Sequence, residues 1–416
     1  MRVFDGRHYT GAELGAMFTD IPPESIIVST LPRSVGYVAL LLKCIRERSV
    51  FCPLAHNLPT AKSAELIARI NPNYIVSTEG TIKTGAPRRS SEGLGYIIHT
   101  SGSTGKPKGV LCDFDPLIRV VTHQASRLRP QKAAWILSPG FDASLSDILS
   151  TVIHGGELHI PPFRATQLKN LGSYFKEHNI DTCDIPPSLL AHMKRADYPT
   201  LKSVVCGGEI VADSLTETWG DVLHIAYGPT EAAVCSNMAH PKIPSGGPWL
   251  GDFLPGCEGM VFNGSNLQPI SEEPGELWLH GQNLARGYLG DKSLTAARFV
   301  IRNGNRYFRT GDIVDGRSGQ LRFLGRNDRQ VKIRGNLVCP EEIESALAPL
   351  VGGALVVKQH EKLVLYSQRQ ISLAEVNKYI SDRLPSHMLI SRVEDFAEIP
   401  RLENEKPNFK ELERNG

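Results

Sequence analysis

The sequence has no long apolar run, no excess of one charge and no block of basic residues. Its longest nearly apolar stretch, residues 346–357, contains Pro349, Gly352 and Gly353 and is shorter than the roughly 18 residues that a membrane span needs. Basic residues outnumber acidic ones by only 46 − 44 = 2, so nothing favours a nucleic acid or an anionic membrane surface as partner. These absences leave a small molecule as the expected ligand.

Paired cysteines and a leader segment are also missing. The eight cysteines are scattered singly, without a CxxC pair or the spacing of a metal site, so we expect buried, reduced thiols. The N-terminus carries Arg2, Asp5 and Arg7 and lacks the apolar stretch and cleavage site of a signal peptide. This pattern predicts a cytoplasmic protein.

What the sequence contains is an α/β pattern. Its 416 residues, at about 150 per domain, predict two or three domains. Short apolar runs that end in Gly, Ser or Thr clusters alternate with a helical stripe at residues 144–154, which is typical of layers with largely parallel sheets. Near Leu324 a charged stretch with several glycines precedes a smaller α+β pattern. The predicted domains are residues 1–327 and residues 328–416.

Two helices are expected in the second domain from the signals at their N-termini. Pro340 is followed by two acidic residues, which are favoured near the positive end of a helix. Ser372 and Glu375 form a capping box before an apolar stripe, and Pro385 is expected to end that helix. Two strands between these helices complete the α+β pattern.

One loop has the composition of a phosphate-binding site. The strand that ends near Thr100 is followed by Ser, Thr, Gly and two lysines up to Gly109. Glycines let backbone N–H groups approach an anion, hydroxyls donate hydrogen bonds and lysines add positive charge. The Walker A pattern is absent, because no glycine lies five residues before Gly105 and Pro107 follows Lys106. A solvated Gly/Ser turn is the alternative interpretation of this loop taken alone.

Six motifs in order resemble those of the adenylate-forming superfamily, specifically the amino-acid-activating adenylation domains of nonribosomal peptide synthetases. The motifs are Ser101 to Gly109, Ala226-Tyr-Gly-Pro-Thr-Glu231, Gly275-Glu-Leu-Trp with Ala285-Arg-Gly-Tyr288, Tyr307-Phe-Arg-Thr-Gly-Asp312, Gly325-Arg-Asn-Asp328 with Gln330-Val-Lys-Ile-Arg-Gly335, and Asn404-Glu-Lys406. The match extends over nearly the whole chain. It implies a large N-terminal domain of layered α/β sheets and a small mobile C-terminal α+β domain that carries the catalytic lysine.

The resemblance implies a site for ATP and Mg²⁺. Tyr227 would stack on adenine, Thr230 would contact the α-phosphate, and Glu231 would hold Mg²⁺, a cation that prefers oxygen ligands. Asp312 would accept the ribose hydroxyls, and Arg326 would contact the ribose or the phosphates. The other ATP-binding residues that it implies are Thr100, Ser101, Ser103, Thr104, Lys108, Gly208 and Gly228. A surface carboxylate is the alternative interpretation of Glu231 or Asp312 taken alone.

The catalytic residues that the resemblance implies are Lys406, Thr230 and Glu231. Lys406 would offset the negative charge that grows around the α-phosphate in the transition state. The usual Asn-Gly-Lys reads Asn404-Glu-Lys406 here, and Lys410 is a nearby alternative. Asp328 would be the hinge about which the small domain rotates between adenylation and thioester formation.

The segment Phe141-Asp142-Ala-Ser144 resembles the motif that opens the substrate pocket. In the family its aspartate pairs with the α-ammonium group of an amino acid, whereas a buried carboxylate would repel a fatty or aryl acid. The alternative role of Asp142 is to cap the helix that follows. The other pocket positions that the resemblance implies are Ala143, Ser146, Asp184, Val205, Gly207, Ala226, Val234 and Cys235, and most of them are small.

Asp184 decides the expected class of substrate. A carboxylate among otherwise uncharged walls needs a cationic or hydrogen-bonding partner. We therefore expect a basic amino acid, namely arginine, lysine, ornithine or a shorter diamino acid. An amide-bearing residue such as glutamine is the alternative.

The implied activity is that of a stand-alone enzyme that forms an aminoacyl adenylate and loads the amino acid onto the phosphopantetheine thiol of a carrier protein. No carrier motif follows Lys406, so the carrier is expected in trans. A CoA ligase or an amide-forming ligase is one alternative, and a nucleotide-binding regulator without turnover is another. Two departures bear on carrier docking or oligomeric state: the short region before Val3, and Leu111-Cys-Asp-Phe114 in place of a histidine-containing segment.

Overall fold

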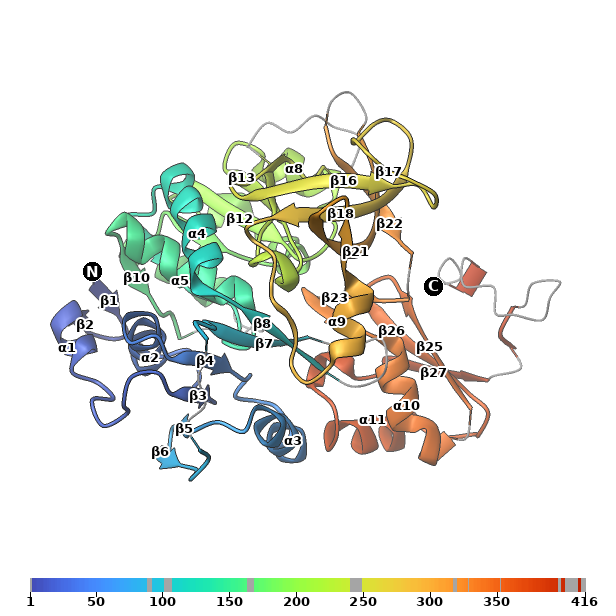
Figure 1. Cartoon of the computed structure of the whole chain (residues 1–416), viewed down its shortest axis with the longest axis horizontal. Helices are drawn as coiled ribbons and strands as arrows, with labels where there is room; N and C mark the ends of the chain where they lie inside the picture. The colour runs from blue at the N-terminus through green and yellow to red at the C-terminus, as the bar shows by residue number, and fades with distance from the viewer. Residues whose placement is uncertain are drawn as a thin grey trace. The chain divides into compact units, whose positions relative to one another are not determined.

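The computed structural model describes residues 2–87, 92–100, 107–162, 168–239, 249–316, 320–327, 329–351, 353–395, 398–400 and 411–412 (Figure 1). The chain divides into two compact units. The first contains Met1–His56, Asn71–His99 and Gly109–Asn327, and the second contains Asn57–Ile70, Thr100–Lys108 and Asp328–Gly416. Each unit has a hydrophobic core of its own.

A nine-stranded sheet in the first unit carries the strands of the expected substrate pocket. Its spatial order is β15 (Asp252–Phe253), β14 (Asn237–Ala239), β13 (Leu223–Tyr227), β12 (Ser203–Gly207), β11 (Thr182–Asp184), β9 (Lys132–Ala134), β10 (Glu157–His159), β1 (Arg2–Phe4) and β2 (His8–Thr10). The strands from β13 to β1 run parallel to one another. Their carboxyl ends therefore meet along one edge of the sheet.

The second sheet brackets the expected phosphate loop. Its order is β19 (Gly287–Tyr288), β8 (Lys108–Cys112), β7 (Tyr96–Thr100), β4 (Val50–Pro53), β3 (Ile26–Ser29), β5 (Tyr74–Ser77) and β6 (Gly80–Lys83). The strands β7 and β8, which precede and follow that loop in the sequence, are neighbours in this sheet.

Three helices and strands of both sheets form the main core. The helices are α2 (Val35–Arg46), α4 (Phe114–Leu128) and α5 (Asp142–His154), whose apolar side chains pack with Tyr37, Tyr96 and Trp135. The helix α5 confirms the stripe predicted for residues 144–154 and ends at Gly155, where φ is +82°. A left-handed residue is a common end of a helix, and glycine adopts it without a steric penalty. All eight cysteines are buried and none forms a disulfide.

A third, antiparallel sheet positions two charged residues of the candidate site. Its order is β17 (Leu267–Gln268), β16 (Cys257–Phe262), β18 (Gly275–Gly281), β21 (Asn305–Asp315) and β20 (Phe299–Arg302), and β22 (Arg322–Arg326) also pairs with β21. The other described helices of the first unit are α1 (Gly11–Gly15), α6 (Leu168–His178), α7 (Pro187–Leu190), α8 (Asp213–Trp219) and α9 (Lys292–Arg298).

The second unit contains α3 (Thr60–Ile70), the hairpin of β23 (Val331–Ile333) and β24 (Asn336–Val338), and a three-stranded sheet of β25 (Ala354–Gln359), β26 (Lys362–Ser367) and β27 (Arg392–Asp395). The helices α10 (Pro340–Val351) and α11 (Leu373–Ser381) cover one face of this sheet (Figure 1). The expected start at Pro340 and the capping box of Ser372 and Glu375 are confirmed. The helix α11 ends at Ser381, before Pro385, because a turn through Ile380 and Leu384 replaces its last helical turn.

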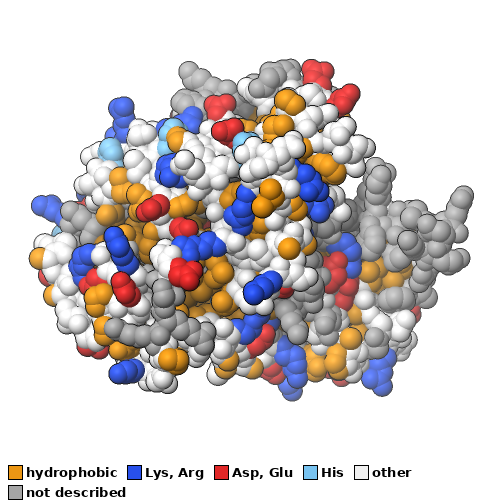
Figure 2. All heavy atoms as spheres, viewed as in Figure 1, with side chains coloured by type: hydrophobic (Ala, Val, Ile, Leu, Met, Phe, Trp, Pro, Cys, Tyr) orange, Lys and Arg blue, Asp and Glu red, His pale blue; other side chains and the backbone are white. Residues whose placement is uncertain are grey.

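Charge is mixed on the face of the molecule that Figure 2 shows, where acidic and basic side chains are interspersed. This mixture agrees with a formal net charge of +2. Within the described ranges no helix is both long enough and apolar enough to cross a membrane.

The capping box generates a first prediction. In Ser372→Ala, the backbone N–H of Glu375 loses its bond to the serine hydroxyl, so the second unit should lose about 1 kcal/mol of unfolding free energy. Chemical denaturation followed by circular dichroism measures the loss. The matched control is Ser381→Ala at the other end of α11, which should change stability by less than about 0.5 kcal/mol. Equal stability of both variants would contradict the prediction.

Candidate active site

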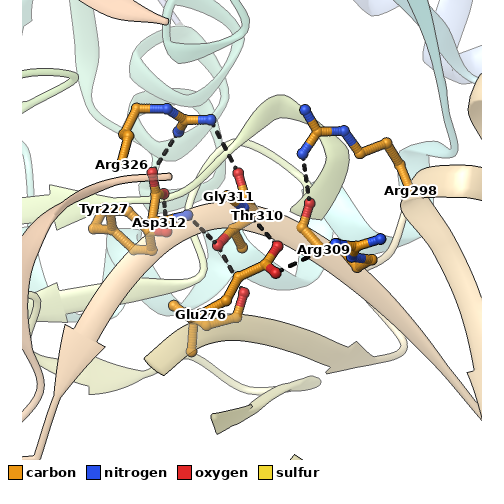
Figure 3. A network of polar contacts seen from close by, with 9 residues as sticks. Tyr227, Glu276, Arg298, Arg309, Thr310, Gly311, Asp312 and Arg326 are labelled. Carbon is orange, nitrogen blue, oxygen red and sulfur yellow. Dashed lines mark hydrogen bonds and ion pairs between the residues drawn. The ribbon is translucent and has the colours of Figure 1, made fainter. Parts of the chain in front are cut away.

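The clearest polar cluster of the site lies where β13, β21 and β22 come together. Asp312 on β21 lies opposite Arg326 on β22, and the Arg326 guanidinium donates a short hydrogen bond to the Asp312 carboxylate. The Tyr227 hydroxyl at the end of β13 donates to the other carboxylate oxygen at 2.5 Å. Figure 3 shows the three side chains turned toward one another. Tyr227 and Arg326, which lie on two different strands, thus both donate to the carboxylate of Asp312.

A second layer of contacts fixes the backbone beneath this cluster. The Thr310 hydroxyl accepts from the backbone N–H of Asp312 at 3.0 Å and donates to the carbonyl of Leu277 at 2.7 Å. The Glu276 carboxylate accepts from the N–H of Gly311 at 3.1 Å and pairs with Arg309 at 3.5 Å (Figure 3). The contacts with Leu277 and Glu276 join β21 to β18, and the Thr310 hydroxyl links this pairing to the backbone of Asp312.

Glu231 lies just after β13, on a short 3₁₀ turn at Thr230–Ala232. Its side chain is buried, and its Oε1 accepts a hydrogen bond of 2.7 Å from the Tyr288 hydroxyl. Burial, reinforced by the charge of Glu231, raises the pKa of Tyr288 far above its ordinary value, so the tyrosine stays a donor. The backbone carbonyl of Glu231 also accepts a hydrogen bond, from the N–H of Ala285 at 2.8 Å.

The backbone around this turn is tightly constrained. A Cβ on Gly228 would lie 2.6 Å from atoms of Val234, Cys235 and Ser236, so only glycine fits. Val234 has φ of +72°, an unusual conformation for a β-branched residue. Such strain persists only where surrounding structure over-determines it, and it is frequent at ligand sites.

The expected phosphate loop is only partly described. Thr100 ends β7, as expected for the strand that precedes the loop, whereas Lys108 and Gly109, which were expected in the loop, belong to β8. Gly208 follows β12 with φ of +81°, which favours glycine. The expected site residues Ser101, Ser103, Thr104, Asp328 and Lys406 lie outside the described residues.

The expected pocket residues of the sheet share one face. Asp184 on β11 is in register with Val205 on β12, and Gly207 on β12 is in register with Ala226 on β13. Residues in register point to the same face, and so do residues two apart on one strand, so all four line one surface. A Cβ on Gly207 would lie 2.3 Å from the carbonyl of Ala226, which accounts for the glycine.

The opposite face of the same strands is core. Cys183, Val204, Cys206 and Ile225 belong to a separate buried cluster. Val205 and Cys235 instead pack with Val120 and Leu128 of α4, and Ala226 and Val234 border the same cluster. The register therefore places the expected pocket residues on one face of the sheet and the cluster of Cys183, Val204 and Ile225 on the other.

The helix α5 supplies the remaining pocket residues, Asp142, Ala143 and Ser146. Its N-cap residue is Phe141, and Asp142 is the first helical residue, so the interpretation of Asp142 as N-cap is wrong. The Asp142 carboxylate instead accepts from the N–H of Ala143 at 2.9 Å, at the positive end of the helix. Ser146, one turn further on, is buried and donates a short hydrogen bond to the side-chain carbonyl of Gln124 on α4.

Three carboxyl groups influence one another in this region. Burial raises the pKa of Asp184 to about 7, and the charge of Asp142 adds to the shift. Asp147 on α5, which the sequence patterns did not single out, is also buried, and its pKa is raised well above the ordinary value by burial and by Asp184. Arg33 opposes that shift of Asp147. The pocket therefore disfavours additional negative charge.

A metal ion could be held here only with help from a ligand. The described residues contain no group of three His, Cys, Asp or Glu side chains that could bind a metal. Glu231 offers a buried carboxylate that Arg326 and Tyr227 do not bind in the hydrogen bonds described above, whereas the buried carboxylate of Asp312 accepts from both of them. This sparse donor set fits Mg²⁺, which is commonly bound by one or two carboxylates together with substrate phosphates.

Comparison with known proteins identifies the family. The model of the family described as AMP-binding enzyme matches residues 7–289. The chain belongs to the AMP-binding enzyme family. It is thus an adenylate-forming enzyme that uses ATP, and the fold class predicted from the six motifs is confirmed.

The relatives are larger proteins, and the structural neighbours include an adenylation domain and a CoA synthetase. The nonribosomal peptide synthetase CymA of Salinispora arenicola is 32% identical over 415 residues, which cover 94% of this chain and 5% of that protein. The Vibrio cholerae adenylation domain AlmE, in complex with glycyl-adenosine-5'-phosphate, has TM-score 0.85 at 19% identity, with 99% and 93% of the two chains covered. o-Succinylbenzoate CoA synthetase of Bacillus subtilis has TM-score 0.82 at 19% identity, with 99% and 94% covered. These two neighbours show the shared fold.

The buried carboxyl of Asp184 generates a second prediction. Its pKa is raised from 3.8 to about 7, so the folded protein binds a proton that the unfolded chain releases, and stability falls as pH rises through this window. In Asp184→Asn, the thermal midpoint should therefore fall less between about pH 5 and about pH 8 than in the wild type. Differential scanning fluorimetry at the two pH values measures the difference.

The control for this prediction is Asp20→Asn, because Asp20 is exposed. Its pH dependence should equal that of the wild type. If Asp184→Asn also shows the wild-type pH dependence, the carboxyl of Asp184 is ionised in the folded protein throughout this range.

Proposed function

We propose that this chain activates an amino acid as its aminoacyl adenylate, with release of pyrophosphate, and then transfers it to the phosphopantetheine thiol of a separate carrier protein. Residues 1–327 act as the adenylate-forming domain and residues 328–416 as the lid. The main support for this proposal is a pair of polar clusters in the first unit. One surrounds Asp312 and would bind the nucleotide, and the other includes Asp142 at the N-terminus of α5 and would bind the amino acid.

The cluster at Asp312 suits the ribose and adenine of ATP. The carboxylate can accept both ribose hydroxyls, and Arg326 and Tyr227 hold its two oxygens in position. The ring of Tyr227 offers a flat surface on which the purine stacks. Binding of ATP requires the nucleotide to share this carboxylate with Tyr227 and Arg326.

The first half-reaction needs no covalent enzyme intermediate. A carboxylate oxygen of the amino acid attacks the α-phosphorus of ATP, and the bond from that phosphorus to the pyrophosphate oxygen breaks. Thr230 would contact the α-phosphate, and Glu231 would hold Mg²⁺, which neutralises phosphate charge. Lys406 would stabilise the charge that develops on the α-phosphate and the attacking carboxylate.

The second half-reaction uses the same adenylate. The phosphopantetheine thiolate attacks the acyl carbon, AMP leaves, and a thioester forms. Rotation of the small domain about Asp328 would withdraw Lys406 and clear the path for the thiol. The similarity to nonribosomal peptide synthetases supports a carrier as acceptor.

The pocket supports an amino acid with a basic side chain. Asp142, at the entrance, would pair with the α-ammonium group. Asp184 would pair with a cation on the side chain, and such a cation would restore the ionised form that burial disfavours. Ser146, Gly207 and Ala226 are small residues, so they would leave room for a long side chain such as that of arginine, lysine or ornithine.

A CoA ligase is the second candidate function. The fold shared with o-succinylbenzoate CoA synthetase favours it, because that fold serves CoA as acceptor as well. The two candidates share the adenylate and differ only in the thiol that attacks it.

Amino-acid-dependent exchange of pyrophosphate into ATP tests adenylation. Across the proteinogenic amino acids plus ornithine, 2,4-diaminobutyrate, 2,3-diaminopropionate and β-lysine, we expect exchange with basic substrates. Lys406→Ala should reduce the rate by at least about a hundredfold, because it removes charge stabilisation from the transition state. Lys378→Ala, on the exposed side of α11, is the matched control and should keep the wild-type rate.

Each other result has a defined meaning. Exchange with a different class of amino acid would retain adenylation and reject Asp184 as partner of a side-chain cation. Absence of exchange with every amino acid in the wild type would reject the proposed function.

The acceptor is tested separately from the adenylate. With the preferred amino acid and ATP, mass spectrometry of a panel of phosphopantetheinylated carrier proteins should show acylation, whereas CoA should remain free. Acyl-CoA formation at a faster rate would instead assign the chain to the CoA ligases. Carriers that lack phosphopantetheine are the control and should remain unmodified.

A further inference from the structure

One buried polar side chain in the pocket region is absent from the set of residues that the family resemblance implies. Gln124 lies on α4 and is only 3% exposed. Its neighbours one helical turn before and after, Val120 and Leu128, pack on Val205 and Cys235 of the pocket wall. Side chains four apart lie on one face of a helix, so Gln124 faces that wall too.

Contact with Ser146 places Gln124 beside one of the expected pocket residues of α5. Asp142 and Ser146 are four residues apart on α5, which corresponds to a separation of about 5–6 Å along its axis. Ser146 donates a hydrogen bond to Gln124 Oε1, so the amide lies at the depth of Ser146. A substrate whose α-ammonium group meets Asp142 approaches Gln124 only with the far end of a long side chain.

The chemistry of the amide fits such an end group. A carbonyl oxygen accepts two hydrogen bonds, and Ser146 supplies one to Gln124 Oε1. A guanidinium or ammonium group has several N–H donors and can therefore bond to Asp184 and to Gln124 at once. The hydroxyl of Ser146 fixes the amide orientation that presents its oxygen.

We infer that Gln124 is a further specificity-determining residue, which accepts a hydrogen bond from the far end of a long cationic side chain that also pairs with Asp184. The substrate class is accordingly a long basic amino acid, namely arginine, lysine or ornithine, whereas the side chain of 2,3-diaminopropionate is too short to reach the amide. This inference rests on the proposed function, because it assumes that the pocket binds an amino acid.

Pyrophosphate exchange with Gln124→Leu and Gln124→Glu tests the inference. The leucine variant loses the acceptor, so kcat/KM for the preferred long basic amino acid should fall roughly ten- to a hundredfold, while the KM for ATP stays unchanged. The kcat/KM of the leucine variant for 2,3-diaminopropionate should differ from that of the wild type by less than threefold. The glutamate variant adds a carboxylate and should raise the preference for arginine or lysine over glutamine about tenfold or more.

The ratio of kcat/KM between two amino acids separates binding from a structural role, because partial unfolding lowers both values equally. Gln282→Leu, at an exposed position, is the matched control and should keep the wild-type ratios. If the wild type exchanges with basic amino acids and both Gln124 variants keep its ratios, the inference is wrong and the proposed function stands. If the wild type exchanges with no amino acid, both are wrong. Should the leucine variant be insoluble, the ratio of the glutamate variant decides.

Discussion

The parallel pairing of β11, β12 and β13 is the constraint on which the candidate site depends. It brings Asp184, Val205, Gly207 and Ala226 onto one face and ends each strand at the same edge of the sheet. A shift of one residue in any strand would exchange pocket and core, because neighbouring residues of a strand point to opposite faces. The core cluster on the other face, with Cys183, Val204 and Ile225, opposes such a shift.

The carboxyl groups of the site differ because their surroundings differ. Asp312 is held by Arg326 and Tyr227, which satisfy both of its oxygens with hydrogen bonds. Asp184 is partly buried close to Asp142 and Asp147, and the loss of solvent around its carboxyl raises its pKa to about 7. A charged ligand side chain is the natural complement of Asp184, whereas neutral hydroxyls suffice for Asp312. In the proposed function, Asp312 would therefore recognise the nucleotide and Asp184 the side chain of the amino acid.

The charged side chains of the candidate site are positioned both by sheets and by strained turns. The carboxylate of Asp312 is held by bonds between strands, whereas Glu231 lies on a turn next to Val234, whose φ of +72° is unusual. The same turn requires glycine at position 228, since a Cβ there would contact the following backbone. Residues that bind charge are in this way fixed before any ligand arrives, which lowers the cost of ordering them upon binding.

The family and the α/β layers could be predicted from the sequence, and the site residues that the motifs imply remain predictions. Glycine-rich loops, charged motifs and capping boxes each consist of residues close together in the sequence. They can therefore be recognised from the sequence alone, as at Ser372 and Tyr227. The sequence did not determine that Asp142 begins the helix without capping it, or that Gln124 and Asp147 are buried near the pocket. Only the tertiary structure decided these points. The burial, pKa and hydrogen-bond partners of these residues depend on how α4, α5 and the sheet pack together. These elements are far apart in the sequence, so no local sequence pattern specifies their contacts.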